Sequence, residues 1–317
     1  MKMLALPESG IRSSIKKHNS DLDLFCDWVE ASAVFSDDPI SMSDVVDVLL
    51  ENTVYEDQDF AEEFVSSAWA VLRARFQQLG NPLGLVVTNT RLSRSGGNAW
   101  TAEPAYAFCL YMACLSYLYP NALANLADAS AQGELFEKVA VESLTQAFPG
   151  WEVRRLGWSP DNPQKLIKIV GALTSDLREV PGAEVSTHVD NYSKELGLDV
   201  LLFRKFKDEN ASFPVIMMQC ASGKNWPGKR KTPDLSIWRK IISFNSNPIK
   251  GIVIPYAFAD DNSFRRESTT VEGLFLDRYR LLSPSGTTAW VSDELKKEIL
   301  NFLAPRVPVL PTSAVSV

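Results

Sequence analysis

The chain has 317 residues, of which 45% are hydrophobic and 22% are charged. This balance excludes a disordered chain and is typical of a globular protein with one large domain or two smaller ones. The formal net charge of −7 disfavours nucleic-acid binding at first sight, but the charge is uneven. Residues 1–127 contain 8 Lys and Arg against 16 Asp and Glu, whereas residues 128–317 contain 24 against 23. A surface that binds phosphate groups is therefore expected in residues 128–317 and not in residues 1–127.

Helical patterns dominate the first 127 residues, because apolar side chains recur there at helical spacing. We expect helices at Asp21–Phe35, Phe60–Leu79 and Pro104–Tyr119, and a β-prone run at Leu83–Thr88. A further helix, capped by Ser41 or Ser43, is expected to run through Val45 to Leu50. The apolar run within the last helix is too short to span a membrane. Nothing here carries recognisable chemistry, so we interpret residues 1–127 as a helical accessory domain that binds a partner protein.

The pattern changes at about residue 128, where helices and strands begin to alternate. We expect helices at Gly133–Phe148, Thr270–Leu282 and Ser292–Leu303, and a helix or a mixed segment at Pro163–Leu177. Strands are expected at Trp151–Leu156, Leu198–Phe203, Phe213–Gln219 and Gly251–Ala257. A polar turn at 207–211 predicts a hairpin of the second and third strands. The fold class is thus α/β, with a second domain at 128–305 and a flexible tail at 306–317.

The four cysteines contain no CxxC pair and predict free, mostly buried thiols in a reducing cytoplasm. The N-terminus has no long apolar stretch, so we expect no secretory signal. No membrane partner is expected either. A zinc site is disfavoured, because His18 and His188 are far from any cysteine in the sequence.

Basic residues gather after the second strand of the predicted hairpin. We expect nucleic-acid contacts from Lys229, Arg230, Lys231, Arg239 and Lys240, because a local basic patch binds phosphates whatever the global charge. A solvated surface is the alternative. Trp226 and Trp238 interleave with the bases of the run from Lys224 to Lys240. For Trp226, packing under the loop is favoured over stacking on a base. The charged run Asp277–Arg280 is interpreted as pairs within a helix.

Three oxygen-bearing side chains fall on a helix and the two hairpin strands. These are Glu137, Asp199 between apolar residues, and Gln219 at the end of an apolar strand. Mg²⁺ prefers a few oxygen ligands, and a nearby lysine such as Lys224 can offset charge that develops on a phosphate. Other readings remain open: Asp199 could pair with a core arginine, Glu137 could face solvent, and Gln219 could bond the backbone.

The motifs Gly133-x-x-Phe-Glu137, Gly197-x-Asp199 and the strand ending at Gln219 resemble the PD-(D/E)XK superfamily, in particular Mrr-like and phage-defence nucleases. The resemblance covers roughly residues 130–260 and implies a restriction-endonuclease-like mixed central sheet flanked by helices. It further implies that Glu137, Asp199 and Gln219 bind Mg²⁺ or Mn²⁺ for cleavage of DNA. The expected role is that of an effector in prokaryotic anti-phage defence, acting with an ATPase, helicase or sensor that binds the N-terminal domain.

The chain departs from the family at the lysine, which usually lies two residues after the acid or glutamine. Ala221 occupies that place here, and Lys224 is the nearest replacement. The alternative is therefore an inactive relative that binds nucleic acid or serves as a scaffold. No Gly-x-Ser-x-Gly motif of a serine hydrolase occurs in the sequence. No phosphate-binding loop occurs either, so an ATP-driven motor would have to be another chain.

Overall fold

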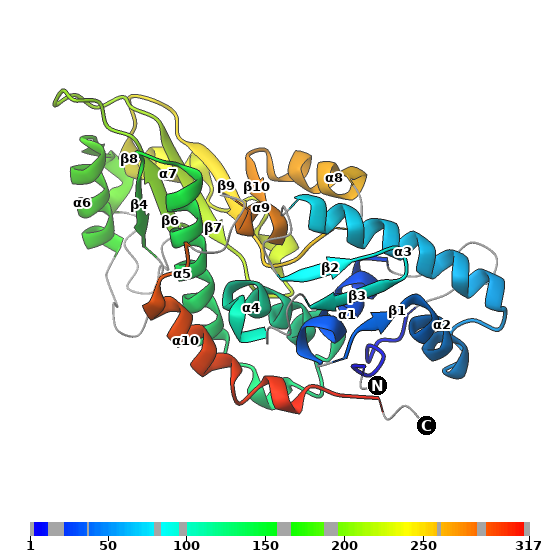
Figure 1. Cartoon of the computed structure of the whole chain (residues 1–317). Helices are drawn as coiled ribbons and strands as arrows, with labels where there is room; N and C mark the ends of the chain where they lie inside the picture. Colours follow the sequence, from blue (N-terminus) through cyan, green and yellow to red (C-terminus); the bar gives the residue numbers. More distant parts are fainter. Residues whose placement is uncertain are drawn as a thin grey trace. The chain divides into compact units, whose positions relative to one another are not determined.

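A computed structural model describes residues 3–11, 22–36, 38–78, 84–94, 100–156, 166–186, 196–258, 261–283 and 290–313. The protein is mixed α/β and divides into two compact units (Figure 1). Unit 1 comprises Met1–Ala127, Pro255–Ser263 and Arg278–Val317, and unit 2 comprises Asp128–Ile254 and Phe264–Asp277. The chain passes from unit 1 to unit 2 at the expected boundary after residue 127. Unit 1, however, also contains two later segments that the sequence analysis assigned to the second domain.

Unit 1 is mainly helical and carries one small antiparallel sheet, in the order β1-β3-β2. Before residue 128 its elements are α1 (Leu22–Phe35), β1 (Ile40–Ser41), α2 (Met42–Glu51), α3 (Gln58–Gln78), β2 (Leu85–Val87), β3 (Arg91–Arg94), η2 (Trp100–Ala102), α4 (Pro104–Ala113), the π-helix η3 (Cys114–Leu118) and η4 (Ala124–Leu126). The predicted cap of α2 is confirmed. Ser41 Oγ accepts from the N–H of Asp44, whose carboxylate accepts from the N–H of Ser41, which completes a capping box.

The last part of the chain returns to unit 1 through α9 (Arg278–Leu282), α10 (Asp293–Leu303) and η7 (Val307–Val309). Residues 306–313, which the sequence analysis placed in a flexible tail, are packed: Leu310 is buried, and Thr312 forms a β-bridge with Leu4. The N–H of Ala5 also donates to the carbonyl of Pro311 over 2.9 Å. This short pairing with the N-terminal segment explains why a Pro- and Val-rich stretch is ordered.

Unit 2 is built on a five-stranded mixed sheet in the order β10-β9-β7-β6-β4. Its elements are α5 (Ala129–Ala147), β4 (Glu152–Arg155), α6 (Leu166–Leu177), β5 (Val180–Pro181), η5 (Ala183–Ser186), β6 (Val200–Phe203), β7 (Val215–Cys220), η6 (Trp226–Lys229), α7 (Leu235–Ile241), β8 (Ile242–Ser243), β9 (Ile249–Val253) and β10 (Leu274–Leu276). β6 runs antiparallel to both of its neighbours, β4 and β7, whereas β7, β9 and β10 run parallel to one another. The predicted hairpin is therefore confirmed as β6–β7.

Helices cover both faces of this sheet. Leu201 and Met217 point into an apolar core with side chains of α6 and α7, including Trp238. Alternate strand residues such as Val200 and Met218 point to the opposite face. α5 packs against β4 and β7, and Figure 1 shows it lying across the sheet. All of β6 and β7 is buried, which explains their continuous apolar sequence.

The prediction of one helix over Thr270–Leu282 is wrong, because a strand interrupts it. Helix α8 (Asp261–Val271) ends before Glu272, whose φ is +55°, and β10 then pairs with β9. Gly273 makes this turn possible: a Cβ there would lie 2.2 Å from the carbonyl oxygen of Lys250. The close approach of two backbones requires glycine, a signal that a helical periodicity count does not register.

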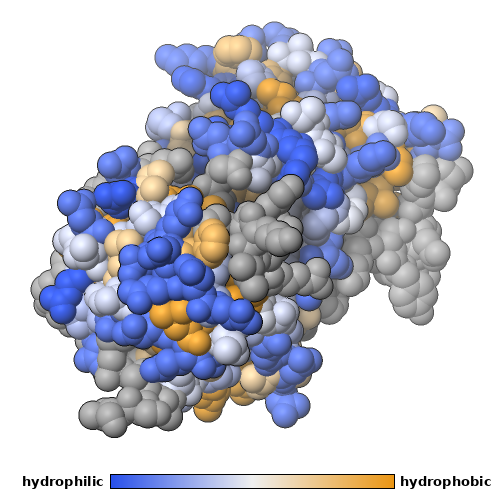
Figure 2. Space-filling model, turned by 90° about the vertical axis from the view of Figure 1, so that its right-hand side faces the viewer, coloured by the Kyte–Doolittle hydropathy of each residue, from blue (hydrophilic) through white to orange (hydrophobic). Residues whose placement is uncertain are grey.

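Among the described helices, none is both long and apolar enough to cross a membrane. Figure 2 shows a face on which hydrophilic residues predominate, and its hydrophobic residues lie in small separate patches. The four cysteines, Cys26, Cys109, Cys114 and Cys220, are free and buried as predicted.

Candidate functional site

Asp199 and Gln219 lie side by side on neighbouring strands of unit 2. Asp199 directly precedes Val200, which pairs with Met218, and Gln219 follows Met218. The side-chain amide of Gln219 donates to Oδ2 of Asp199, and the backbone N–H of Cys220 donates to the same oxygen over 2.6 Å. The exposed fractions are 8% for Asp199 and 5% for Gln219. The hairpin thus brings two of the predicted site residues into contact in a buried place.

Gly197 explains the glycine that precedes Asp199 in the sequence motif. Its φ is +72°, in the left-handed region that glycine adopts without strain. A Cβ at this position would lie 2.7 Å from the Cβ of Thr232 and 2.8 Å from Oε1 of Gln219. The glycine therefore lets the Gln219 side chain and the loop around Thr232 close over the start of β6.

Glu137, the third predicted ligand, lies on α5 and is bound by an arginine. Nε of Arg155, the last residue of β4, donates to Oε2 of Glu137 over 2.9 Å. Nη1 of Arg155 lies 3.4 Å from Oε1 of Glu134. Glu137 is buried, with 8% of the residue exposed, so the reading of Glu137 as a solvent-facing residue is wrong. Its ion pair offsets the cost of burying the carboxylate.

Cys220 is a common neighbour of these groups. Burial raises the pKa of its thiol, and the carboxylates of Asp199 and Glu137 raise it further, whereas Lys229 and Arg155 oppose them. The thiol at the end of β7 is therefore influenced electrostatically by two carboxylates and two cations.

The donor atoms at this place are of the kind that Mg²⁺ or Mn²⁺ binds, namely two carboxylates and one amide oxygen. Their present arrangement is not that of a completed metal centre. Gln219 turns its nitrogen toward Asp199, and Glu137 holds Arg155. In the part of the chain that the structure describes, no group of three or more His, Cys, Asp or Glu residues is placed to hold a metal ion. Ligation would require Gln219 to turn its amide over and Glu137 to leave Arg155.

The lysine positions differ in their surroundings. Ala221, at the usual place of the family lysine, is fully buried, and its N–H donates to Val253 O over 2.9 Å. Lys224, the predicted catalytic lysine, is exposed in the turn after β7. Lys229 is half-buried and lies near enough to Cys220 to lower the pKa of that thiol. This electrostatic effect of Lys229 on Cys220 could not be predicted from the sequence, because the two residues are separated by the turn and by η6.

The predicted nucleic-acid-binding residues do not all point to solvent. Lys231, Arg239 and Lys240 are exposed, whereas Arg230 is half-buried and pairs with Glu267, with Nη2 and Oε2 2.5 Å apart. Trp226 is buried and stacks on Phe275 with ring centroids 6.0 Å apart, which confirms that it packs under the loop. Arg230 lies over the ring of Trp226. Arg230 therefore helps to hold the loop that presents the other bases.

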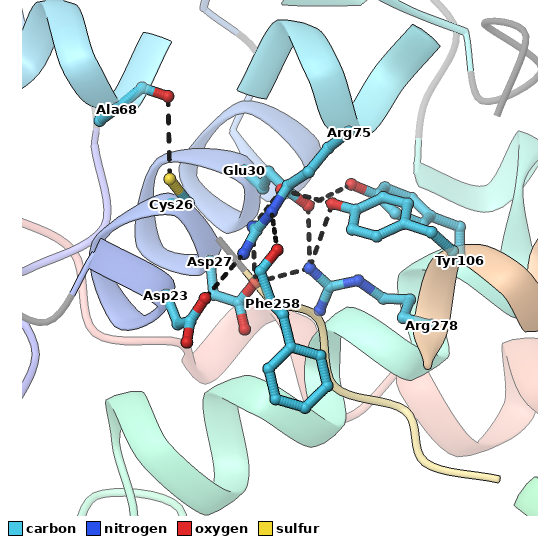
Figure 3. A network of polar contacts seen from close by, with 10 residues as sticks. Asp23, Cys26, Asp27, Glu30, Ala68, Arg75, Tyr106, Phe258 and Arg278 are labelled. Atoms are coloured by element: carbon cyan, nitrogen blue, oxygen red, sulfur yellow. Dashed lines mark hydrogen bonds and ion pairs between the residues drawn. The ribbon is translucent and has the colours of Figure 1, made fainter. Parts of the chain in front are cut away.

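Among the described residues, the most deeply buried charges are in unit 1, for which the sequence predicts no chemistry (Figure 3). The network consists of Asp27, Glu30, Arg75, Tyr106, Arg278 and Tyr279. Arg278 is fully buried, and its Nη2 lies 2.6 Å from Asp27 and 3.0 Å from Glu30. The interpretation of Arg278 as part of an intrahelical pair is therefore wrong. Its partners lie about 250 residues earlier in the chain, a distance that no local pattern bridges.

This network holds Glu30 in its charged form. Burial by itself would raise the pKa of Glu30, but Arg278 and Arg75, with hydrogen bonds from Tyr106 and Tyr279, lower it below the usual value. Both tyrosine hydroxyls donate to Glu30 over 2.6 Å. Two arginines thus face two buried carboxylates, and we interpret the network as the polar centre of unit 1 rather than as a reactive site.

No protein-family model matches the chain, and searches of the curated proteins and of the solved structures found no match either.

Proposed function

We propose that this chain is a metal-dependent endonuclease that hydrolyses phosphodiester bonds of DNA. The observation that carries the proposal is the buried contact of Asp199 with Gln219 on adjacent strands. Glu137 lies on α5, which packs against β7, and its carboxylate acts electrostatically on Cys220 at the end of that strand. Buried carboxylates are costly unless they are paired or bind a cation. The mixed sheet with helices on both faces agrees with the restriction-endonuclease-like fold that the sequence motifs imply.

In this proposal Asp199, Glu137 and Gln219 hold Mg²⁺ or Mn²⁺. When bound, the ion would polarise the scissile phosphate and lower the pKa of an attacking water. Lys229 or Lys224 would offset the charge that develops on the phosphate. Lys231, Arg239 and Lys240, exposed on the loop and on α7, would contact the DNA backbone.

The biological setting in the proposal is prokaryotic anti-phage defence, and it is carried by the resemblance of the motifs to phage-defence nucleases. Unit 1 would bind the partner protein, an ATPase, helicase or sensor, because the sequence has no phosphate-binding loop of its own. The four free, buried cysteines support a cytoplasmic location.

The proposal is tested by incubating the purified chain with supercoiled plasmid and Mg²⁺ or Mn²⁺. We expect nicking that EDTA abolishes and that Asp199→Asn lowers at least about a hundredfold, since the variant removes a charged ligand of the ion. Asp208→Asn is the matched control, because Asp208 is exposed on the hairpin turn. Equal nicking by the wild type and Asp199→Asn would dismiss the assigned site.

A second candidate function is that of a catalytically inactive subunit that binds nucleic acid or scaffolds a complex. Buried Ala221 at the lysine position favours this candidate, as does the pairing of Glu137 with Arg155. Stable retention of DNA in a gel-shift assay, without nicking in either metal ion and in the presence of the partner, would select it.

A further inference from the structure

We infer that the guanidinium of Arg155 binds the carboxylate of Glu137 until a metal ion displaces it. Arg155 thereby lowers the affinity of the site for the metal ion. The inference rests on the proposed function, since it assigns a regulation to the same carboxylates. Arg155 would be a positioning residue, because it acts on the metal only through Glu137.

The backbone places Arg155 next to the candidate ligands. Arg155 pairs with Val200 across β4 and β6, and the following N–H, that of Leu156, donates to the carbonyl of Asp199 over 2.7 Å. β4, β6 and β7 are consecutive neighbours in the sheet. Arg155 is therefore carried by the strand beside Asp199, while its guanidinium reaches α5.

The ion pair is sheltered enough to compete with a metal ion. The exposed fraction of the side chain is 11% for Glu137 and 24% for Arg155. Attraction between charges in such surroundings is screened much less than at an open surface. A divalent cation that takes Glu137 as a ligand must therefore displace the guanidinium, and this competition weakens metal binding.

The paired state also leaves part of the guanidinium unsatisfied. Nε and Nη1 of Arg155 have the two glutamates as partners, but Nη2 is buried and has no hydrogen-bond partner among the described residues. A buried donor without a partner is unfavourable, so the pair holds Glu137 without satisfying the arginine completely. This arrangement suits a contact that is broken when the site is loaded.

The preceding residue provides a matched control. Arg154 carries the same charge on the same strand, but its Nη2 lies 3.2 Å from Glu152 and 3.1 Å from Asp176. Arg154→Gln therefore removes one positive charge from β4 without releasing Glu137. Any difference between Arg154→Gln and Arg155→Gln reports the Arg155–Glu137 contact rather than the net charge.

The test is a calorimetric titration of the full-length chain with Mn²⁺, without DNA, for the wild type, Arg155→Gln, Arg154→Gln and Asp199→Asn. We expect Arg155→Gln to bind Mn²⁺ roughly fivefold more tightly than the wild type, because it removes the partly buried ion pair that holds Glu137. Arg154→Gln should match the wild type, and Asp199→Asn should lose binding. The rise in melting temperature on adding Mn²⁺ should likewise be largest for Arg155→Gln.

The outcomes separate the inference from the proposed function. Unchanged or weaker Mn²⁺ binding by Arg155→Gln, with binding lost in Asp199→Asn, overturns the role of Arg155 and leaves the nuclease proposal standing. Absence of Mn²⁺ binding in every variant overturns both. If Arg155→Gln does not fold, Arg155→Lys replaces it, since lysine keeps the charge but cannot present two donors in a fork. Tighter binding by Arg155→Lys then supports the inference, and equal or weaker binding overturns it.

Discussion

Gln219 donates a hydrogen bond from its side-chain amide to the carboxylate of Asp199. The two residues lie next to Val200 and Met218, which pair across β6 and β7. The other end of the Gln219 amide, Oε1, lies 2.8 Å from the position that a Cβ at Gly197 would take. The amide is thus enclosed between the carboxylate it contacts and the glycine that begins the motif. The Gly-x-Asp pattern and the glutamine therefore form one structural unit.

Gly197→Ala should destabilise unit 2 by about 2 to 3 kcal/mol, from the left-handed backbone and from the displacement of Gln219 and Thr232. Urea unfolding measures the change, and metal-dependent nicking should fall with it. Gly133→Ala is the control, because a Cβ at Gly133 in α5 meets nothing within 4 Å. That variant should be neutral or more stable by up to about 1 kcal/mol. Equal stability of the two variants would contradict the enclosure of Gln219.

Lys229→Ala should lower the rate of DNA cleavage at saturating DNA by about 100-fold relative to the wild type. Lys224→Ala should lower this rate less. The reason is that Lys229 acts electrostatically on the end of β7, whereas Lys224 is exposed in the turn. Lys224→Ala should change mainly the affinity for DNA and its dependence on salt. Single-turnover cleavage rates distinguish the two effects, and a larger rate loss in Lys224→Ala would restore the assignment made from the sequence.

Glu30→Gln should lower the stability of unit 1 by about 3 to 5 kcal/mol, because it leaves Arg75 and Arg278 buried with a reduced counter-charge. The measurement is the urea midpoint followed by tryptophan fluorescence. Glu62→Gln, on the exposed side of α3, should stay within about 0.5 kcal/mol of the wild type. A small effect of Glu30→Gln would mean that the network is not the polar centre of unit 1.

Glu103, before α4, gives a prediction for pH. Burial raises the pKa of its carboxyl from 4.5 to about 7, although Lys296 opposes the shift. The folded state therefore favours the protonated form of Glu103. The contribution of this protonated carboxyl to the free energy of unfolding is complete below pH 4.5 and is lost as the pH rises toward 7. The loss should be on the order of 1 kcal/mol, since the group is only half-buried and solvent screens it.

Glu103→Gln should remove this dependence, so that the variant equals the wild type at acidic pH and exceeds it above neutrality. Urea midpoints across the pH range measure the difference. Glu51→Gln, at an exposed position of α2, should leave the wild-type profile unchanged. Parallel profiles for Glu103→Gln and the wild type would show that the carboxyl ionises normally in the folded chain.

Local patterns were sufficient for the hairpin that joins Asp199 and Gln219. Two apolar runs separated by a polar turn predict adjacent strands, and polar residues at their ends must then be neighbours. The ion pair of Arg155 with Glu137 could not be predicted in this way. It depends on how α5 crosses the sheet, and nothing in either segment of sequence encodes that crossing by itself.

The buried arginine network shows the same limit at longer range. Arg278 lies in a run of alternating charges that is typical of an exposed helix, yet it is fully buried beside Asp27 and Glu30. β10 was missed for a related reason, since its three residues form a strand only because β9 offers an open edge. In both places a tertiary partner decides the structure, and local propensity does not.

The order of segments in unit 1 has a consequence for biosynthesis. Asp27, Glu30 and Arg75 leave the ribosome before all of unit 2, but Arg278 and the segment that bridges to Leu4 are made after it. Unit 2 can therefore complete its sheet while unit 1 still waits for its closing pieces. A nascent chain would expose apolar faces of its first helices throughout that interval, and such exposed surface is prone to aggregate.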